Sequence, residues 1–182
     1  MNTGSSWTPL APVNTIQENA ELAWAFIQAR MRDTNAHEVD VVAHSLGGVI
    51  ARRILHDPAF GAKAQEAIHT VVLLGTPNGG SPCSDALVVP ANRELTIPAM
   101  AAFNMQNPGY PGVRSISLYA DHWSTTCFAA GAGDSMVPAW SALTEPVDIP
   151  QRIALGVDHA NMTSDSRVYH DYVKPYLQNP PS

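Results

Sequence analysis

The residue best suited to covalent chemistry in this chain is the serine within residues 41–48, VVAHSLGG. A run of β-branched residues leads directly into Ser45, and apolar residues at helical spacing follow it, which predicts a strand-to-helix turn. Small residues on either side, Ala43 and Gly47, allow a tight, strained turn that exposes the serine oxygen. Ser45 is therefore a candidate nucleophile; the alternative is a buried serine in an ordinary turn.

The predicted turn would also stabilise negative charge on a substrate. A helix that begins directly after Ser45 places the positive end of its dipole near the hydroxyl. The backbone N–H of Leu46 can donate to an oxyanion. A serine hydroxyl is nevertheless a weak nucleophile until a base takes its proton and a carboxylate orients that base. The sequence must supply both groups elsewhere.

The pattern of apolar residues predicts the helices and strands around the turn. Thr15 and Glu18 have the spacing of a capping box, and apolar residues then recur on one helical face as far as Met31. A buried strand is predicted at residues 39–43, and a helix resumes at 49–55. The candidate nucleophile therefore lies between a buried strand and a helix.

The rest of the chain repeats the alternation of strands and helices. Further strands are predicted at residues 70–74, 115–119 and 152–155, and a closing helix at 164–176. Alternation of this kind is typical of an α/β fold with a parallel sheet flanked by helices, here of about four strands. With 182 residues, 45% of them hydrophobic, residues 1–182 are expected to form a single domain.

The regular pattern fails at about residues 78–112, which are rich in proline and glycine. A segment this long is usually functional within a compact domain, so a lid-like or cap-like role competes with that of a surface excursion. Its apolar residues suit an acyl chain or a core equally well. They are Leu87, Val88, Val89, Met100 and Phe103.

Two segments carry a resemblance to a known family. Residues 43–47, AHSLG, resemble the nucleophile elbow of lipases and esterases of the α/β-hydrolase fold, with alanine in place of the usual first glycine. Residues 71–81, VVLLGTPNGGS, are similar to the strand and loop that follow the elbow in bacterial triacylglycerol lipases. The resemblance implies an α/β-hydrolase-like fold and a serine hydrolase.

The resemblance also implies the other members of a triad, in the order serine, acid, histidine. Residues 133–138, GDSMVP, resemble the acid loop of the family, which makes Asp134 the orienting acid. His159 follows the last predicted strand, as the histidine of the family does, and would be the general base and acid. No cofactor is implied.

Other acids and histidines compete for these roles. Asp121 lies nearer the end of its strand and would be the acid if residues 122–133 form an excursion. Asp158 adjoins His159, but neighbouring side chains on an extended segment point apart. His44 is a candidate for lining the substrate pocket. His122 has no second histidine at ligand spacing, so no metal site is predicted.

Charge and composition exclude several classes of partner. Ten basic residues face sixteen acidic ones, the net charge is −6, and no basic stripe suits nucleic acid. No apolar stretch is long enough for a membrane span, and no basic-then-apolar signal sequence opens the chain, so the compartment stays unassigned although similar lipases are often secreted. The two cysteines, Cys83 and Cys127, allow one disulfide.

The family pattern is abbreviated at the N-terminus. An α/β-hydrolase normally has several strands before the elbow, and a loop after one of them supplies the second oxyanion donor; here that donor is unknown. The strand before the elbow would then have an unpaired edge, which favours a homo-oligomer through that edge. A fragment of a longer enzyme, a natural minimal hydrolase and an inactive relic all fit this pattern.

The predicted function is hydrolysis of carboxylic esters, including lipids, through Ser45, His159, Asp134 and an acyl-enzyme intermediate. Two alternatives stay open. One is a catalytically weak or inactive chain that acts as a binding or assembly module; the other is an amidase or thioesterase that uses the same triad.

Overall fold

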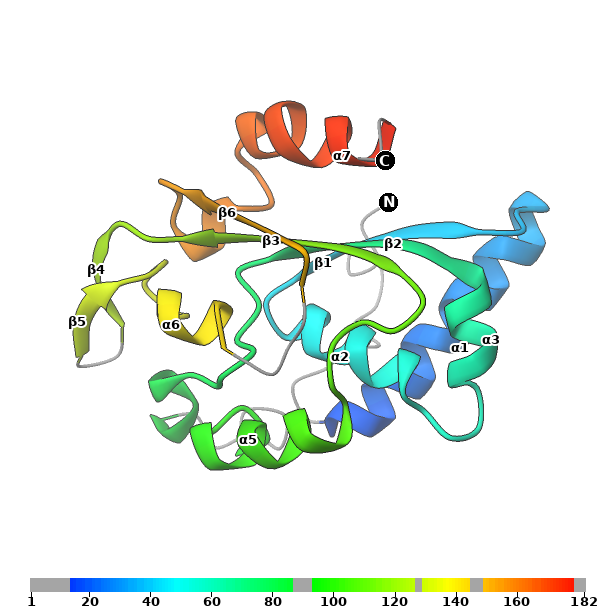
Figure 1. The fold of residues 1–182 in the computed structure, drawn as a ribbon, viewed down its shortest axis with the longest axis horizontal. Coiled ribbons are helices and arrows are strands. Elements are labelled where there is room, and N and C mark those ends of the chain that lie inside the picture. Colours follow the sequence, from blue (N-terminus) through cyan, green and yellow to red (C-terminus); the bar gives the residue numbers. More distant parts are fainter. Residues whose placement is uncertain (1–13, 87–92, 127–128, 145–148, 179–182) are drawn as a thin grey trace.

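The computed structural model describes residues 14–86, 93–126, 129–144 and 149–178 (Figure 1). Its centre is a parallel sheet with the order β1-β2-β3-β6. The pairing register places Val42 beside Val72, and Val72 beside Ile116. All four strands predicted from the sequence are confirmed. Their bounds are Val39–His44 for β1, Ile68–Leu74 for β2, Arg114–Ala120 for β3 and Gln151–Leu155 for β6.

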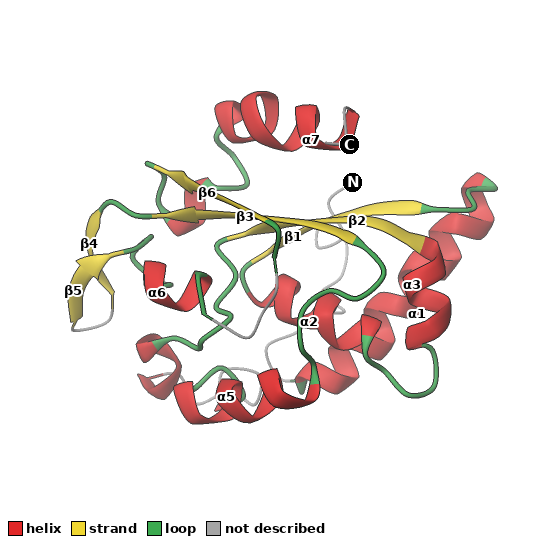
Figure 2. Ribbon diagram, viewed as in Figure 1, coloured by secondary structure: helices red, strands yellow, loops and turns green. Residues whose placement is uncertain are grey.

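Helices cover both faces of this sheet (Figures 1 and 2). On one face lie α1 (Ile16–Thr34), α2 (Leu46–Leu55) and α3 (Gly61–Ala67); on the other lie the π-helical segment η3 (Val168–Val173) and α7 (Lys174–Gln178). The core is divided accordingly: Val71 and Leu73 pack with α1 and α2, whereas Val72 and Leu74 pack with the C-terminal helices. The fold class is therefore α/β, as predicted.

Helix α1 begins where the sequence indicated. The hydroxyl of Thr15 accepts the N–H of Glu18 at 3.1 Å, and the Glu18 carboxylate accepts the N–H of Thr15 at 2.7 Å. The helix ends at Asn35, which adopts the left-handed conformation with φ 53°. Its buried residues include Ile16, Ala20 and Trp24, so the predicted apolar face is the one that packs on the sheet.

Two regions differ from the expected pattern. Part of the segment at 78–112, which was expected to be irregular, forms regular structure: the 3₁₀ helix η1 and the ten-residue helix α5. A two-stranded antiparallel hairpin, β4 with β5, projects from the end of β3. The remaining elements are short. The bounds are Pro82–Ala86 for η1, Ile97–Gln106 for α5, Trp123–Thr126 for β4, Ala129–Ala132 for β5, Ala139–Ala142 for α6 and His159–Asn161 for η2.

Candidate active site

Ser45 occupies the turn between β1 and α2 in a strained backbone conformation. Its φ is 55° and its ψ is −127°, a combination that few residues other than glycine adopt. The N–H of Ser45 donates to the carbonyl oxygen of Leu74 at 2.8 Å, which ties the turn to the carboxyl end of β2. This is the geometry of a nucleophile held at the end of a strand with a helix directly behind it.

The small residues around Ser45 have different neighbours. A Cβ added to Gly47 would lie 3.8 Å from the Cβ of Ala43, so these two positions face one another at an ordinary contact distance that a methyl group would fit. A Cβ on Gly48 would lie 2.1 Å from the hydroxyl oxygen of Thr76, which leaves no room at all. Gly48 is therefore the position that fixes how closely α2 approaches the loop after β2, a requirement that the sequence analysis did not identify.

Asp134 and His159 form a hydrogen-bonded pair. The Nδ1 of His159 lies 2.7 Å from the Oδ2 of Asp134, and their side chains are 12% and 1% exposed. The other carboxylate oxygen accepts the N–H groups of Met136 at 3.0 Å and Val137 at 2.6 Å. Because a carboxylate accepts, Nδ1 of His159 donates and Nε2 is left free to take a proton.

The pair rests against the end of β2 at Gly75. This glycine has φ 56°, and a Cβ on it would lie 2.7 Å from the Oδ2 of Asp134 and 3.0 Å from the Nδ1 of His159. The residue before it, Leu74, accepts the N–H of Ser45. The backbone of Ser45 and the Asp134–His159 pair thus lie against two adjacent residues, Leu74 and Gly75, although they come from distant parts of the chain.

His44, the last residue of β1, contacts His159 directly. Its Nε2 donates to the backbone carbonyl of His159 at 2.9 Å, and the two ring centroids are 4.5 Å apart. Burial and the neighbouring His159 lower the pKa of His44, against smaller opposing effects of the His159 carbonyl and the Asp134 charge. His44 is therefore neutral at pH 7. Its predicted contact with substrate stays a prediction.

The competing residues have other partners or surroundings. Asp121 is exposed at the end of β3, although the excursion that would have favoured it as the acid does exist as the β4–β5 hairpin. Asp158 accepts from the Nε2 of His122 at 2.9 Å and from the hydroxyl of Ser135 at 3.3 Å. These contacts join the loop that carries His159 to the loop that carries Asp134.

The segment at 78–112 packs against α2. Met100 of α5 is fully buried in a cluster with Ile16, Val49 and Leu95, and Phe103 packs against the same cluster. Both residues are therefore core residues of the α2–α5 contact. Leu87, Val88 and Val89, the other candidates for binding an acyl chain, lie outside the described residues, and the lid-like role of the segment stays a prediction.

Cys83 is buried and disulfide-bonded. Its predicted partner, Cys127, lies outside the described residues. Across the part of the chain that the structure describes, no three His, Cys, Asp or Glu side chains are grouped so that they could hold a metal ion. Over the same residues, no helix is both long and apolar enough to cross a membrane.

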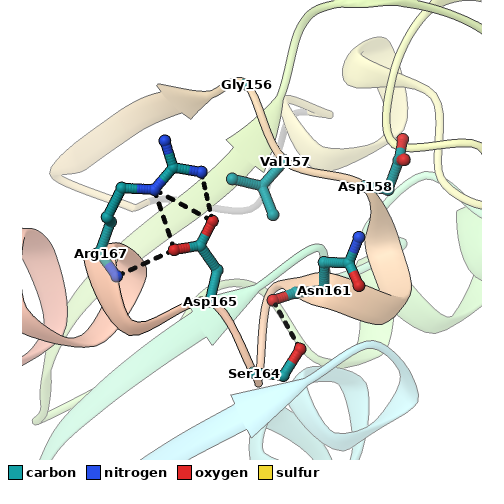
Figure 3. A pocket seen from close by; sticks show the side chains of 7 residues that line it. All are labelled: Gly156, Val157, Asp158, Asn161, Ser164, Asp165 and Arg167. Atoms are coloured by element: carbon teal, nitrogen blue, oxygen red, sulfur yellow. Dashed lines mark hydrogen bonds and ion pairs between the residues drawn. The ribbon is translucent and has the colours of Figure 1, made fainter.

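A polar depression of about 310 Å³ lies beside the loop that carries His159 (Figure 3). Three charged side chains line it, and each has a partner: the guanidinium of Arg167 donates to the carboxylate of Asp165 at 2.5 Å, and Asp158 accepts from the Nε2 of His122. It is lined by Gly156, Val157, Asp158, Asn161, Ser164, Asp165 and Arg167.

Comparisons with known proteins agree with this geometry at the level of the fold. A family model described as "Domain of unknown function (DUF7379)" matches residues 13–93. No curated protein is significantly similar to this chain in sequence. Among solved structures, the mature form of the Bacillus licheniformis lipase BlEst2 is 17% identical with a TM-score of 0.68, over 88% of this chain and 75% of that chain.

Two further structures show the same similarity. The product of the Listeria innocua gene lin2722 is 16% identical with a TM-score of 0.65, over 93% of this chain and 69% of that one. The metagenomic carboxyl esterase MGS0156 is 17% identical with a TM-score of 0.57, over 81% of this chain and 53% of that one. The chain therefore has an α/β-hydrolase-like fold, as found in bacterial lipases and esterases, and spans part of the length of each protein.

Proposed function

We propose that this chain is a serine hydrolase that cleaves carboxylic esters. Ser45 is the nucleophile, His159 the general base and acid, and Asp134 the residue that orients the imidazole. The observation that carries the proposal is the buried 2.7 Å hydrogen bond between His159 and Asp134. This pair lies against Gly75, and the N–H of Ser45 donates to the carbonyl of the preceding residue, Leu74. The strained backbone of Ser45 supports the same assignment.

The reaction follows from these positions. The Nε2 of His159 accepts the hydroxyl proton of Ser45 as Oγ forms a bond to the ester carbonyl carbon. The tetrahedral intermediate collapses, the bond to the alcohol breaks, and the proton passes from His159 to the departing alcohol oxygen. Water then gives a proton to His159 as its oxygen attacks the acyl carbon; the bond from that carbon to Ser45 Oγ breaks, His159 returns the proton to Oγ, and the acid leaves. Asp134 stabilises the imidazolium in both halves.

The oxyanion of the tetrahedral intermediate would be bound by the backbone N–H of Leu46. Leu46 is the first residue of α2, a ten-residue helix, so the positive end of the helix dipole adds to this N–H. We assign no second donor among the described residues. Loss of one such donor costs about 10²–10³ in rate, so slow turnover is consistent with this site.

The names of two structural neighbours favour esters over other acyl substrates. One neighbour is named a lipase and another a carboxyl esterase. An amidase or thioesterase would use the same three residues, and the geometry of the triad does not distinguish these substrates. The substrate series used to test the proposal therefore includes an anilide and a thioester.

The test is hydrolysis of p-nitrophenyl esters of short and long acyl chains, with an anilide and a thioester in parallel, by the wild type and by Ser45→Ala. We expect turnover in the wild type and a loss of about 10³-fold or more in the variant, because no other group can form the acyl-enzyme. Ser166→Ala removes an exposed hydroxyl and is the matched control, expected to retain full activity. No turnover by folded wild type, or equal turnover by Ser45→Ala, would overturn the proposal.

A binding or assembly module is the second candidate, and the observation that favours it is the edge of the sheet. Strand β1 is an edge strand among the described residues, and its Val42 is 47% exposed. An apolar edge of this kind invites pairing with another chain. Failure of the hydrolysis test in folded protein would favour this candidate.

A further inference from the structure

We propose that His44 is a positioning residue that holds the loop of the general base, rather than a residue that contacts substrate. This inference rests on the proposed function. His44 ends β1 and directly precedes Ser45, while its Nε2 donates to the backbone carbonyl of His159 at 2.9 Å. The end of β1 thereby positions Ser45 through the backbone and His159 through the side chain of His44.

The loop that carries His159 needs such an anchor. His159 begins the three-residue 3₁₀ helix η2, so its position depends on contacts with other elements. Its N–H donates to the carbonyl of Asp134 at 2.9 Å, and its own carbonyl accepts from His44, with a longer bond of 3.4 Å from the N–H of Met162. With His44 in place, the backbone of His159 is held on one side by the acid loop and on the other by β1.

Ring packing adds to this hydrogen bond. The imidazoles of His44 and His159 are 4.5 Å apart between centroids and tilted by 42°, so the ring of His44 limits rotation of His159 on one face. The Nδ1 of His159 is fixed by Asp134 at the same time. The free Nε2 is then confined to a narrow range of directions, which is the preorganisation that proton transfer from Ser45 requires.

The charge state of His44 suits this role. Across its packed interfaces His44 faces two titratable groups, His159 and Asp134, and burial keeps the imidazole of His44 neutral. A neutral ring with its proton on Nε2 can donate to a carbonyl and adds no positive charge beside His159. A charged ring at this distance would oppose protonation of His159 during catalysis.

Two substitutions separate the hydrogen bond from the ring. His44→Phe keeps an aromatic ring but removes the donor, whereas His44→Gln keeps an N–H donor at a similar reach but removes the ring. We expect His44→Phe to lower kcat about five- to tenfold with KM within twofold of wild type, the effect of one lost hydrogen bond. His44→Gln should recover most of that loss. His37→Phe, at an exposed histidine, is the matched control.

A second readout does not depend on turnover. The proton that His159 Nδ1 shares with Asp134 is visible by NMR at low field, and it is identified by its loss in Asp134→Asn. We expect this signal in the wild type and in His44→Gln, and its broadening or loss in His44→Phe. If the wild type hydrolyses no ester, the proposed function fails while this signal still tests the positioning role.

Three results would overturn the inference. A His44→Phe variant with wild-type kcat and an unchanged Nδ1 signal would show that the bond to His159 is dispensable. A rise in KM that depends on acyl length, with kcat unchanged, would make His44 a substrate contact. An equal fall in kcat for both variants, with an equal fall in Tm and an intact Nδ1 signal, would reduce His44 to a packing residue.

Discussion

At the scale of single residues, the site depends on positions where a side chain is absent as much as on those where one is present. Gly75 combines a positive φ with contact distances that a Cβ would violate at both Asp134 and His159. Gly48 has the same role between α2 and Thr76. These glycines let the Asp134–His159 pair and the backbone approach more closely than any other residue would allow.

Gly75→Ala tests this account. We expect kcat for ester hydrolysis to fall by at least tenfold, because the new methyl group would displace the hydrogen-bonded pair, and stability to fall by about 1–3 kcal/mol, because alanine is strained at positive φ. Gly156→Ala is the matched control: it lies at the end of β6, and nothing lies within 4 Å of its added Cβ. Equal activity of the two variants would contradict the role given to Gly75.

At the scale of elements, the contact between α2 and α5 contains an unusual group. Arg52 is fully buried, and none of its three guanidinium nitrogens has a hydrogen-bond partner among the residues that the structure describes. Its only described ring contact is the face of Phe103, 5.0 Å from the guanidinium carbon. Burial lowers the pKa of Arg52, with a smaller opposing effect of Tyr110. A buried charge without acceptors is a cost to folding.

The neighbouring arginines of α2 provide a matched pair of substitutions. Arg52→Met is expected to raise the free energy of unfolding by about 1 kcal/mol or more, because it removes a buried charge and keeps contact with Phe103. Arg53→Met should lower the free energy of unfolding by about 1–3 kcal/mol, since Arg53 donates to Gln17, Asn107 and Asp57. Urea denaturation measures both. Destabilisation by Arg52→Met would show that its guanidinium has an unrecognised partner.

The elements that sequence patterns predicted are those with a clear period. The strands β1 and β2 each contain a short apolar run, residues 41–43 and 71–74, and α1 has both a capping box and an apolar face. Helix α5 was missed because it is apolar over most of its length, with a proline in its first turn and no amphipathic period. The β4–β5 hairpin was missed because Ala129–Ala132 consists of small residues that give no alternation.

Within the candidate site, local motifs predicted more than contacts between distant segments. Ser45 was predicted from its own turn, and Asp134 and His159 from resemblance of their loops to a family. The bond from His44 to His159 spans 115 positions and leaves no local pattern. The same holds for Arg52, because it is buried under α5, a helix that is distant from it in the sequence.

At the scale of the whole molecule, the sheet determines how the chain would associate. Strand β1 is the last strand on one side of the described sheet, so its edge away from β2 has no strand partner there. Val42 of this strand is exposed. We propose that this edge pairs with a second copy of the chain, as an unpaired apolar strand favours. The proposal places the association directly beside the turn that carries Ser45.

Val42→Lys tests this association by size-exclusion chromatography with light scattering. We expect the wild type to be a dimer or larger and the variant to shift toward the monomer, because a charge on an edge strand opposes pairing. Leu22→Lys, which places the same charge at an exposed position of α1, should leave the wild-type mass unchanged. A monomeric wild type, or equal behaviour of both variants, would exclude β1 as the interface.

The central claim is that Ser45 is a nucleophile activated by His159, and covalent labelling tests it most directly. The wild type, Ser45→Ala and His159→Ala are treated with a fluorophosphonate, and the adduct is located by mass spectrometry. We expect one adduct per chain on Ser45, none at that position in Ser45→Ala, and labelling slowed at least a hundredfold in His159→Ala. No adduct on Ser45 of folded protein, or labelling at the same rate without His159, would contradict it.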